Sequence, residues 1–383
     1  MSQSTTPDAN RQKRIAVSVF FFIAGFTFSS WASRIPHIQA KLGLNEAELG
    51  GVLLALPCGL FLSSLISGSV VTRLGSKNVL RLAAIAYSCM LVTLGLANHT
   101  ALLVVALFFF GMAGNMFNVS VNTQAVGVER LYGRSILASF HGIWSLAGFS
   151  GASVGTVLIT LGLLPWQHFI VISIVGITLS SFFVSNLIEK STSQKASSGF
   201  KLPDKKILQL GFIAFGCLVC EGTMFDWSGV YFKKVVQVSP GLTALGYAAF
   251  MGCMATGRFL ADKIVMHIGA RKLLQTAGYI ITTGLLVSVI FPNIIMATIG
   301  FMLVGFGVSS VVPIVYSHAG QSKTMEPGKA IAAVGTIGFT GFLSGPPLIG
   351  FVAEATNLRW SFALIALIGL STSFLARTLP AKK

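Results

Sequence analysis

Two carboxylic acids lie inside a long apolar stretch of this 383-residue chain. Glu221 and Asp226 fall within residues 207–232, a stretch long enough to cross a bilayer core, which takes roughly 20 helical residues. Because a charged acid at membrane depth costs on the order of 2.5–3.5 kcal/mol, it marks a functional site by default. We therefore interpret Glu221 and Asp226 as candidate carriers of a coupled proton. The alternative for either one is a structural acid that is permanently ion-paired or hydrogen-bonded.

The spacing of the two acids separates them around a helix. At 100° per residue, Glu221 and Asp226 point in directions about 140° apart. They share a cavity only if the helix unwinds, which Gly222 and Gly229 would permit. Glu221 lies deeper and is the favoured proton carrier. Asp226 lies nearer the predicted outer end, where an ion pair with Arg34 would form an outer gate.

The composition is that of a membrane protein. Only 10% of the residues are charged and 54% are hydrophobic, whereas a soluble protein carries about 25% charged residues. The formal net charge of +16 comes from basic residues in short loops, which is not the basic patch of a nucleic-acid-binding protein. The sequence has no phosphate-binding loop, no metal-ligand spacing and no nucleophile–base set. We therefore expect neither an enzyme nor a cofactor, and no nucleic-acid partner.

Hydropathy predicts twelve membrane spans. Their ranges are 15–34, 48–71, 79–97, 101–126, 136–160, 166–187, 207–232, 242–265, 272–291, 293–318, 331–353 and 359–377. With both termini cytoplasmic, the great majority of lysines and arginines fall in cytoplasmic segments, as the positive-inside rule requires. Glycines of the fifth and eleventh spans are expected to let helix backbones pack closely. Pro346 and Pro347 are expected to bend or break the eleventh span.

The spans divide into two halves of six. The longest polar connection follows the sixth span, and the two halves share an internal repeat, in which Trp31 and Gly50 have the same spacing as Trp227 and Gly246. The predicted domains are a cytoplasmic tail (1–14), a six-helix half (15–187), a cytoplasmic linker (188–206), a second six-helix half (207–378) and a second tail (379–383). Parallel six-span halves are typical of the major facilitator superfamily (MFS), whose substrates bind between the halves near the middle of the membrane.

Two loops resemble a signature of that superfamily, G-x-x-x-D-R-x-G-R-K. Residues 68–77 read GSVVTRLGSK, with Thr72 where the signature has an aspartate, and residues 257–272 of the second half keep the acid as Asp262. The resemblance implies that Arg73, Arg258 and Asp262 act in a cytoplasmic gate. The alternative is that these charges only set the topology, with Arg258 and Asp262 paired one helical turn apart.

Four further segments narrow the resemblance. They are NVSVNTQA (118–125), SFHGIWS (139–145), EGTMFDWS (221–228) and GFLSGPPLIG (341–350). Together they are similar to a branch of small bacterial inner-membrane MFS transporters, broadly akin to the fucose-permease-type group. The resemblance implies an all-α membrane protein with twelve transmembrane helices in two parallel six-helix halves, in a bacterial inner (plasma) membrane.

Polar and aromatic residues of the expected cavity-lining spans are candidates for substrate binding. Asn115, Asn118 and Asn122 share one face of the fourth span, where the alternative role is interhelical hydrogen bonding. His141 and Trp144 share a face of the fifth span, and His141 either relays protons or only hydrogen-bonds a neighbour. The remaining candidates are Trp31, Trp227 and Tyr316.

These observations predict a monomeric secondary transporter that moves a small polar solute, such as a sugar, by alternating access. Coupling to protons through Glu221, Asp226 or both is the favoured energy source. The predicted partners are the solute, protons and the lipid bilayer. One alternative is a proton-driven efflux antiporter for amphipathic compounds. A further alternative is a non-transporting protein of the same fold, such as a sensor or an assembly subunit.

Overall fold

The computed structural model of the chain describes residues 7–133, 136–189, 203–322 and 324–379, without the side chains of Pro7 and Asp262. Within these residues all regular structure is helical, as the sequence predicts. Eleven helical segments of the described part are long and apolar enough to cross a membrane. The remaining predicted span coincides with α9 (Leu245–Ile268), which is as long as the others but carries Arg258 and Lys263. The predicted linker lies largely outside the described residues.

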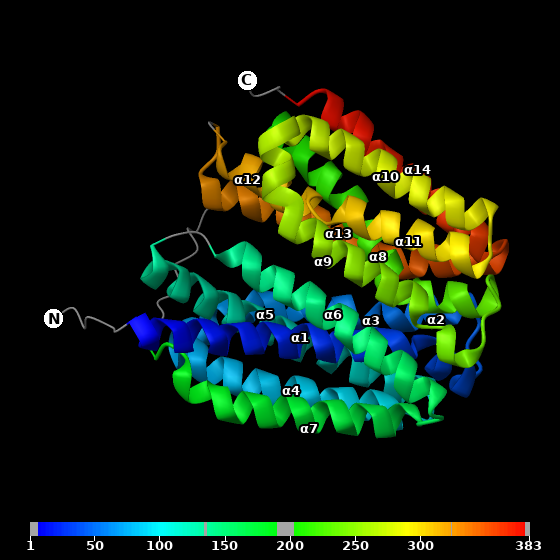
Figure 1. Ribbon diagram of the computed structural model, residues 1–383, viewed down its shortest axis with the longest axis horizontal. Coiled ribbons are helices and arrows are strands. Elements are labelled where there is room, and N and C mark those ends of the chain that lie inside the picture. Colours follow the sequence, from blue (N-terminus) through cyan, green and yellow to red (C-terminus); the bar gives the residue numbers. More distant parts are fainter. Residues whose placement is uncertain (1–6, 134–135, 190–202, 323, 380–383) are drawn as a thin grey trace. The chain divides into compact units, whose positions relative to one another are not determined.

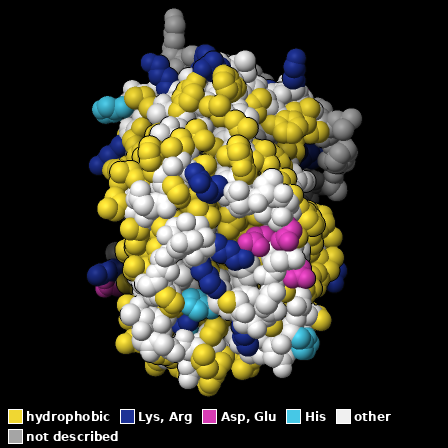
Figure 2. Space-filling model, turned by 90° about the vertical axis from the view of Figure 1, so that its right-hand side faces the viewer, with side chains coloured by type: hydrophobic (Ala, Val, Ile, Leu, Met, Phe, Trp, Pro, Cys, Tyr) yellow, Lys and Arg dark blue, Asp and Glu magenta, His cyan; other side chains and the backbone are white. Residues whose placement is uncertain are grey.

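The helices form two compact units, each described here by itself. Unit 1 comprises residues 1–42 and 55–194, and unit 2 comprises residues 43–54 and 195–383. In Figure 1 the chain runs from blue in unit 1 to red at the end of unit 2. In Figure 2, which shows the right-hand side of Figure 1, acidic side chains gather beside basic ones.

Unit 1 is built around α1. Its helices are α1 (Pro7–Leu42), α3 (Ala55–Leu74), α4 (Ser76–Leu96), α5 (Thr100–Tyr132), α6 (Leu137–Thr160) and α7 (Pro165–Phe183), followed by a short 3₁₀ turn, η1 (Val184–Asn186). Helix α1 packs along α6 through small residues, and Ser29 Oγ donates to the Gly148 carbonyl at 2.5 Å. A Cβ at Gly151 of α6 would lie 2.9 Å from the Phe26 carbonyl oxygen, which confirms close backbone packing through a glycine of the fifth span.

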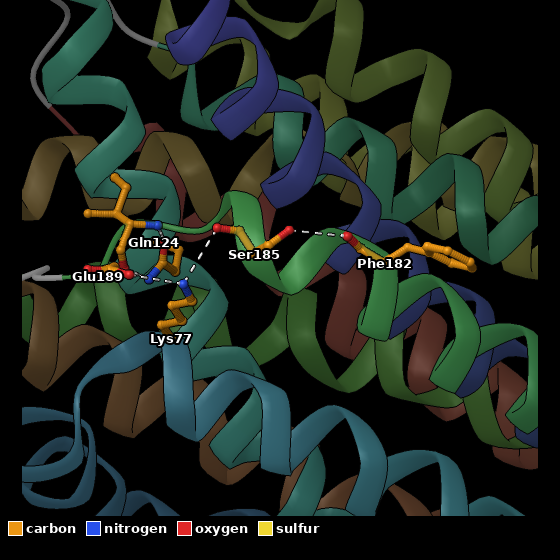
Figure 3. Close-up of polar contacts among 6 residues, drawn as sticks. Lys77, Gln124, Phe182, Ser185 and Glu189 are labelled. Atoms are coloured by element: carbon orange, nitrogen blue, oxygen red, sulfur yellow. Dashed lines mark hydrogen bonds and ion pairs between the residues drawn. The ribbon is translucent and has the colours of Figure 1, made fainter.

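A buried glutamine closes one end of unit 1 (Figure 3). The amide of Gln124, on α5, donates to the Ile188 carbonyl at 2.8 Å and accepts from the Ile188 amide at 2.9 Å. It also donates to Ser76 Oγ at 2.8 Å. Lys77 Nζ lies 3.5 Å from Glu189 Oε1 and 3.5 Å from the Ser185 carbonyl. These contacts hold the segment that follows α7 against the start of α4 and the C-terminal part of α5.

Unit 2 is organised around α8 (Lys205–Lys234), which is buried almost continuously from Val219 to Phe232. The other helices of the unit are α9, α10 (Ala270–Ile290), α11 (Ile294–Val308), α12 (Val311–Gly320), α13 (Pro327–Ala355) and α14 (Leu358–Arg377), with a short 3₁₀ turn, η2 (Pro240–Leu242). Helices α9, α11, α12, α13 and α14 all contact α8. A Cβ at Gly341 of α13 would lie 2.6 Å from the Phe215 carbonyl oxygen of α8, again through a glycine at a predicted contact.

Unit 2 also contains α2 (Glu46–Leu53), although this helix directly precedes α3 in the chain. Asn45 caps the start of α2 with a capping box. The Asn45 side chain accepts a hydrogen bond from the Glu48 backbone amide, and the Glu48 carboxylate accepts one from the Asn45 backbone amide. The helix packs against α13 so closely that a Cβ at Gly50 would lie 2.7 Å from the Pro346 carbonyl oxygen. Lys234 Nζ, at the end of α8, donates to Glu46 Oε1 at 2.6 Å.

Each predicted span coincides with helical structure, but two of the spans consist of two helices rather than one. The second span is two helices, α2 and α3, which meet at Leu54, and the tenth is α11 and α12, which meet at Ser309 and Ser310. By contrast, α13 continues through Pro346 and Pro347, so of the expected bend or break the break does not occur, and the bend stays a prediction. Helix α1 is longer than its predicted span at both ends and begins at Pro7, inside the predicted tail.

Candidate functional site

Glu221 and Arg258 form an ion pair inside unit 2. Glu221 lies near the middle of α8 and Arg258 near the middle of α9, and Arg258 Nη2 donates to Glu221 Oε1 at 3.2 Å. Glu221 is 7% exposed, and the Arg258 side chain is 19% exposed. From the sequence, these two residues were expected to have different roles, Glu221 as a proton carrier and Arg258 in a gate. The structure brings them together near the middle of both helices.

Small residues set the position of this pair. On α8, Gly222 faces the Phe342 ring of α13, with the nearest ring carbon 3.6 Å from the position of a Cβ. On α9, Gly257 lies against Ser309, at the junction of α11 and α12, and a Cβ there would overlap the Ser309 hydroxyl. The packing is tight only at Gly257, next to Arg258, whereas the contact of Gly222 with the Phe342 ring is an ordinary van der Waals contact. Tyr316, on α12, has its hydroxyl 3.2 Å from the position of a Cβ at Gly335 of α13, and its binding role stays a prediction.

Asp226 occupies a separate environment on the same helix. Helix α8 is regular through this stretch, so Glu221 and Asp226 leave it in different directions and do not share a site. The unwinding that would bring them together is not present in the described helix. Asp226 is 9% exposed and takes part in none of the ion pairs among the described residues.

Arg34, the predicted partner of Asp226, is hydrogen-bonded within unit 1. Its Nε donates to Nδ1 of His168 at 3.0 Å, and both side chains are buried. Arg34 Nη2 and His168 Nε2 have no hydrogen-bond partner among the described residues. His168 was not predicted from the sequence, where the one signal was a histidine at the start of an otherwise apolar span. The Arg34–Asp226 gate stays a prediction.

The three asparagines of α5 lie in two different environments. Asn115 is buried and donates to Ser63 Oγ at 3.4 Å and to Ser67 Oγ at 3.3 Å, both on α3. This is the contact expected of an interhelical hydrogen bond. Asn118 is exposed, and Asn122 Nδ2 donates to its side-chain oxygen at 2.9 Å. Asn118 and Asn122 therefore remain the better candidates for contact with a solute.

The aromatic candidates lie in two kinds of environment. Trp31 and Trp227 are fully buried, and neither indole nitrogen has a hydrogen-bond partner among the described residues. His141 is exposed, and its ring meets the Phe21 ring edge-on with centroids 5.3 Å apart. Trp144 is half-buried and lies beside Phe28, with centroids 6.3 Å apart. Binding roles for these four residues stay predictions.

The structure shows fewer contacts for Arg73 and Asp262, the other two predicted residues of the cytoplasmic gate. Arg73 is exposed in the last turn of α3 and takes part in none of the ion pairs among the described residues. Thr72, which replaces the signature aspartate, donates its hydroxyl to the Gly68 carbonyl at 2.7 Å. The side chain of Asp262 lies outside the described part of the chain, so its predicted pairing stays open.

Unit 1 contains a cavity that the sequence analysis did not predict. It has a volume of about 760 Å³ and lies among α1, α5 and α6. Its lining combines basic and apolar side chains: Arg11, Arg14, Ile15, Ser18, Val19, Phe22, Tyr132 and Ile143. The Arg14 guanidinium lies 5.5 Å from the centre of the Tyr132 ring, in cation–π geometry.

The fold and the buried ion pair define a multi-pass helical membrane protein of the transporter class. Residues 15–326 match the model of the Major Facilitator Superfamily, and the chain belongs to this family. It is 34% identical to an uncharacterized MFS-type transporter of Yersinia pestis, over 98% of this chain and 97% of that protein. It is 32% identical to an uncharacterized transporter of Sinorhizobium fredii, over 95% of this chain and 97% of that protein.

A solved structure supports the fold. A bacterial homolog of the human lysosomal transporter Spinster superposes with a TM-score of 0.75 at 13% sequence identity, covering 97% of both chains. At this identity the likeness concerns the fold alone. The resemblance noted from the sequence motifs is therefore confirmed at the level of the family, and the chain is a membrane transporter by family.

Proposed function

We propose that this chain is a proton-coupled secondary transporter of a small polar solute. It works as a monomer in a bacterial inner membrane, with cytoplasmic termini, and it alternates access to a central site. The observation that carries this proposal is the Glu221–Arg258 ion pair, buried at the middle of two helices in a member of a transporter family. Intramembrane ionisable residues of this kind mark proton and substrate pathways.

Proton binding at Glu221 changes the contact between α8 and α9. The charged carboxylate is stabilised by Arg258, 3.2 Å away, whereas the protonated carboxyl group loses most of that attraction. A proton therefore biases the relative stability of two arrangements of these helices, which is what coupling to transport requires. Asp226, which lacks an ion-pair partner among the described residues, is the second candidate for carrying the proton.

The candidate lining favours a polar solute such as a sugar. Asn118 and Asn122 offer amide groups, and His141 and Trp144 offer aromatic faces that are not fully buried. Amide hydrogen bonds combined with aromatic stacking suit a small hydroxylated molecule. Few bases lie deep in the spans, which argues against a solute that carries several negative charges.

Efflux of amphipathic compounds is the second candidate function, and the cavity of unit 1 favours it. Its lining places Phe22, Ile15 and Val19 beside Arg14 and Tyr132. Such a surface accepts a molecule with an apolar body and a polar or anionic end. A rise in tolerance to such compounds on expression of the chain would support this function over uptake of a polar solute.

A thermal-shift screen of the purified protein tests the first proposal. Sugars, nucleosides, amino acids, peptides and drugs are each tested at two pH values. A ligand at 100 times its dissociation constant adds about 2.7 kcal/mol to the free energy of unfolding, which is readily detected. We expect a stabilising solute whose effect depends on pH, with the pH dependence lost in Glu221→Gln or Asp226→Asn. A solute that binds equally at both pH values in all three proteins would contradict proton coupling.

A further inference from the structure

The cavity of unit 1 changes in character along α1, which supplies most of its lining. Arg11 and Arg14 precede the membrane span predicted for this helix, whereas Val19 and Phe22 lie inside that span. These residues share one face of α1, and the helix rises about 16 Å from Arg11 to Phe22. The cavity therefore extends from the level of lipid headgroups to the level of acyl chains.

The charged end of the cavity is basic without a matching acid. None of the described residues that line it is acidic. Arg11 and Arg14 take part in none of the ion pairs among the described residues, and Asp8, one turn before Arg11, is exposed. Glu129, in the last turn of α5, instead accepts hydrogen bonds from two backbone amides at the start of α6, at 2.8 and 2.9 Å. The two arginines are thus placed to attract an anion.

The two guanidinium groups suit a phosphate. Arg14 lies over the ring of Tyr132, 5.5 Å from its centre, and this cation–π contact uses none of the N–H donors of the guanidinium. Arginine N–H groups bind phosphate oxygens in pairs. Because Arg11 and Arg14 are three residues apart on a helix, both side chains can reach the same anionic group.

We propose that this cavity binds an anionic phospholipid of the surrounding bilayer. Its phosphate lies at Arg11 and Arg14, and one acyl chain lies along Val19, Phe22 and Ile143. A phospholipid carries its charge and its chains in the same order, from headgroup level inward, as this lining does. Basic pockets between membrane helices on the cytoplasmic side bind anionic headgroups, and the predicted topology places the start of α1 on that side.

The net charge of the lipid is what the site distinguishes. Phosphatidylcholine carries the same phosphate, but its own ammonium group offsets the negative charge. Phosphatidylglycerol has no such cation, so its charge is balanced by the two arginines. The inference goes beyond the proposed transport function, because a resident lipid needs neither a transported solute nor proton coupling.

Thermal unfolding of the purified protein in neutral detergent micelles measures the binding. The probes are dioleoyl phosphatidylglycerol, dioleoyl phosphatidylcholine and glycerol 1-phosphate. We expect phosphatidylglycerol to bind at least about tenfold more tightly than phosphatidylcholine, since each arginine near an anionic headgroup contributes about fivefold in affinity. Glycerol 1-phosphate carries an anionic phosphate without acyl chains and should bind far more weakly than phosphatidylglycerol.

Substitutions assign the preference to the cavity. Arg11→Gln and Arg14→Gln should each lower the affinity for phosphatidylglycerol about fivefold, and the double variant should bind both lipids equally. Arg81→Gln/Arg130→Gln is the matched control, because it removes two exposed arginines of unit 1 that are not part of the lining, and it should keep the preference. Phe22→Ala should weaken the binding of both lipids and leave the preference between them.

Native mass spectrometry of the unmodified protein gives a measurement that does not depend on the variants folding. At equal mole fractions, more phosphatidylglycerol than phosphatidylcholine should stay bound. Glu221→Gln, which impairs the proposed proton coupling, should retain this preference. Equal retention of the two lipids, or a preference that survives in the Arg11→Gln/Arg14→Gln variant, would overturn the inference. Glycerol 1-phosphate binding as tightly as phosphatidylglycerol would also overturn it, in favour of a site for a soluble phosphate.

Discussion

Arg34 of α1 is held by His168 of α7, with Arg34 Nε donating to His168 Nδ1 at 3.0 Å in the interior of unit 1. The histidine accepts at Nδ1, so this nitrogen carries no proton, and the imidazole is neutral in this arrangement. A buried arginine is more often paired with a carboxylate. Among the described residues, the Arg34 guanidinium is hydrogen-bonded to this neutral ring, which makes the pair sensitive to any change at residue 168.

Replacing His168 by phenylalanine should destabilise unit 1. The ring volume is kept, but the Arg34 donor loses its acceptor in a buried site, which costs about 1–3 kcal/mol of unfolding free energy. Thermal unfolding of the purified protein measures the change. His168→Gln, which retains an acceptor, is the control and should lose less. Equal stability of His168→Phe and the unmodified protein would show that the hydrogen bond is not needed.

Two adjacent glycines of α2 provide a matched test of its packing. A Cβ at Gly50 would lie 2.7 Å from the Pro346 carbonyl oxygen and 3.1 Å from Gly350 Cα, whereas a Cβ at Gly51 would meet nothing within 4 Å. Gly50→Ala should therefore cost about 1–3 kcal/mol through overpacking against α13. Gly51→Ala should be neutral or slightly stabilising, because alanine favours the helix. Similar melting temperatures for both variants would contradict the close contact.

The Glu221–Arg258 pair should show strong coupling in a double-mutant cycle. Arg258→Gln alone leaves the buried Glu221 carboxylate unpaired and should cost about 3–5 kcal/mol at pH 8. Glu221→Gln combined with Arg258→Gln removes both charges and should recover most of that loss. The cycle is measured by thermal or denaturant unfolding in detergent. Additive losses in the double variant would mean that the two side chains do not interact.

Asp204 should contribute a small pH-dependent stability at the start of α8. Hydrogen bonds from the Thr324 hydroxyl and from the Ile207 and Lys206 amides hold the pKa of Asp204 below its ordinary value of 3.8. The stabilisation is therefore complete above about pH 4 and is lost as the pH falls through the lower pKa of the folded state. The side chain is half-exposed, so solvent screens the effect.

The corresponding measurement compares Asp204→Ala and Asp204→Asn at pH 7 and pH 3. Loss of the helix cap should cost about 1 kcal/mol in Asp204→Ala at pH 7 and less at pH 3. Asp204→Asn keeps a capping oxygen and should cost little at either pH. A penalty for Asp204→Ala that is the same at both pH values would show that ionisation of this residue does not matter.

Most of the fold follows from hydropathy, because helices that face lipid must be continuous apolar stretches. The twelve predicted spans coincide with helices for this reason. The breaks at Leu54 and at Ser309–Ser310 were not predicted, although each lies just before a proline, Pro57 or Pro313, which has no N–H to bond the carbonyl four residues back. Pro346 and Pro347 were expected to bend or break the eleventh span, and α13 continues through both prolines without a break.

The site was predictable only in part. Glu221 is conspicuous because an acid in an apolar stretch is rare, and helical spacing gave its divergence from Asp226 correctly. Its pairing with Arg258 was not predictable, because the two residues are 3.2 Å apart in space but lie on different helices of the chain. A motif resemblance assigned Arg258 to a gate, and sequence spacing offered Asp262 as its nearest partner. His168 escaped notice because a lone histidine carries no pattern.

The segment from Gly43 to Leu54 precedes α3 in the chain and yet packs within unit 2, where it covers α13 around Gly350. A gene split in the linker at residues 188–206 would therefore not yield two self-sufficient polypeptides. The first would carry α2 without the surface that accommodates it. The second would expose the glycines and Pro346 that α2 covers. The two fragments should therefore restore the folded protein only when they are synthesised together. Either fragment alone should aggregate.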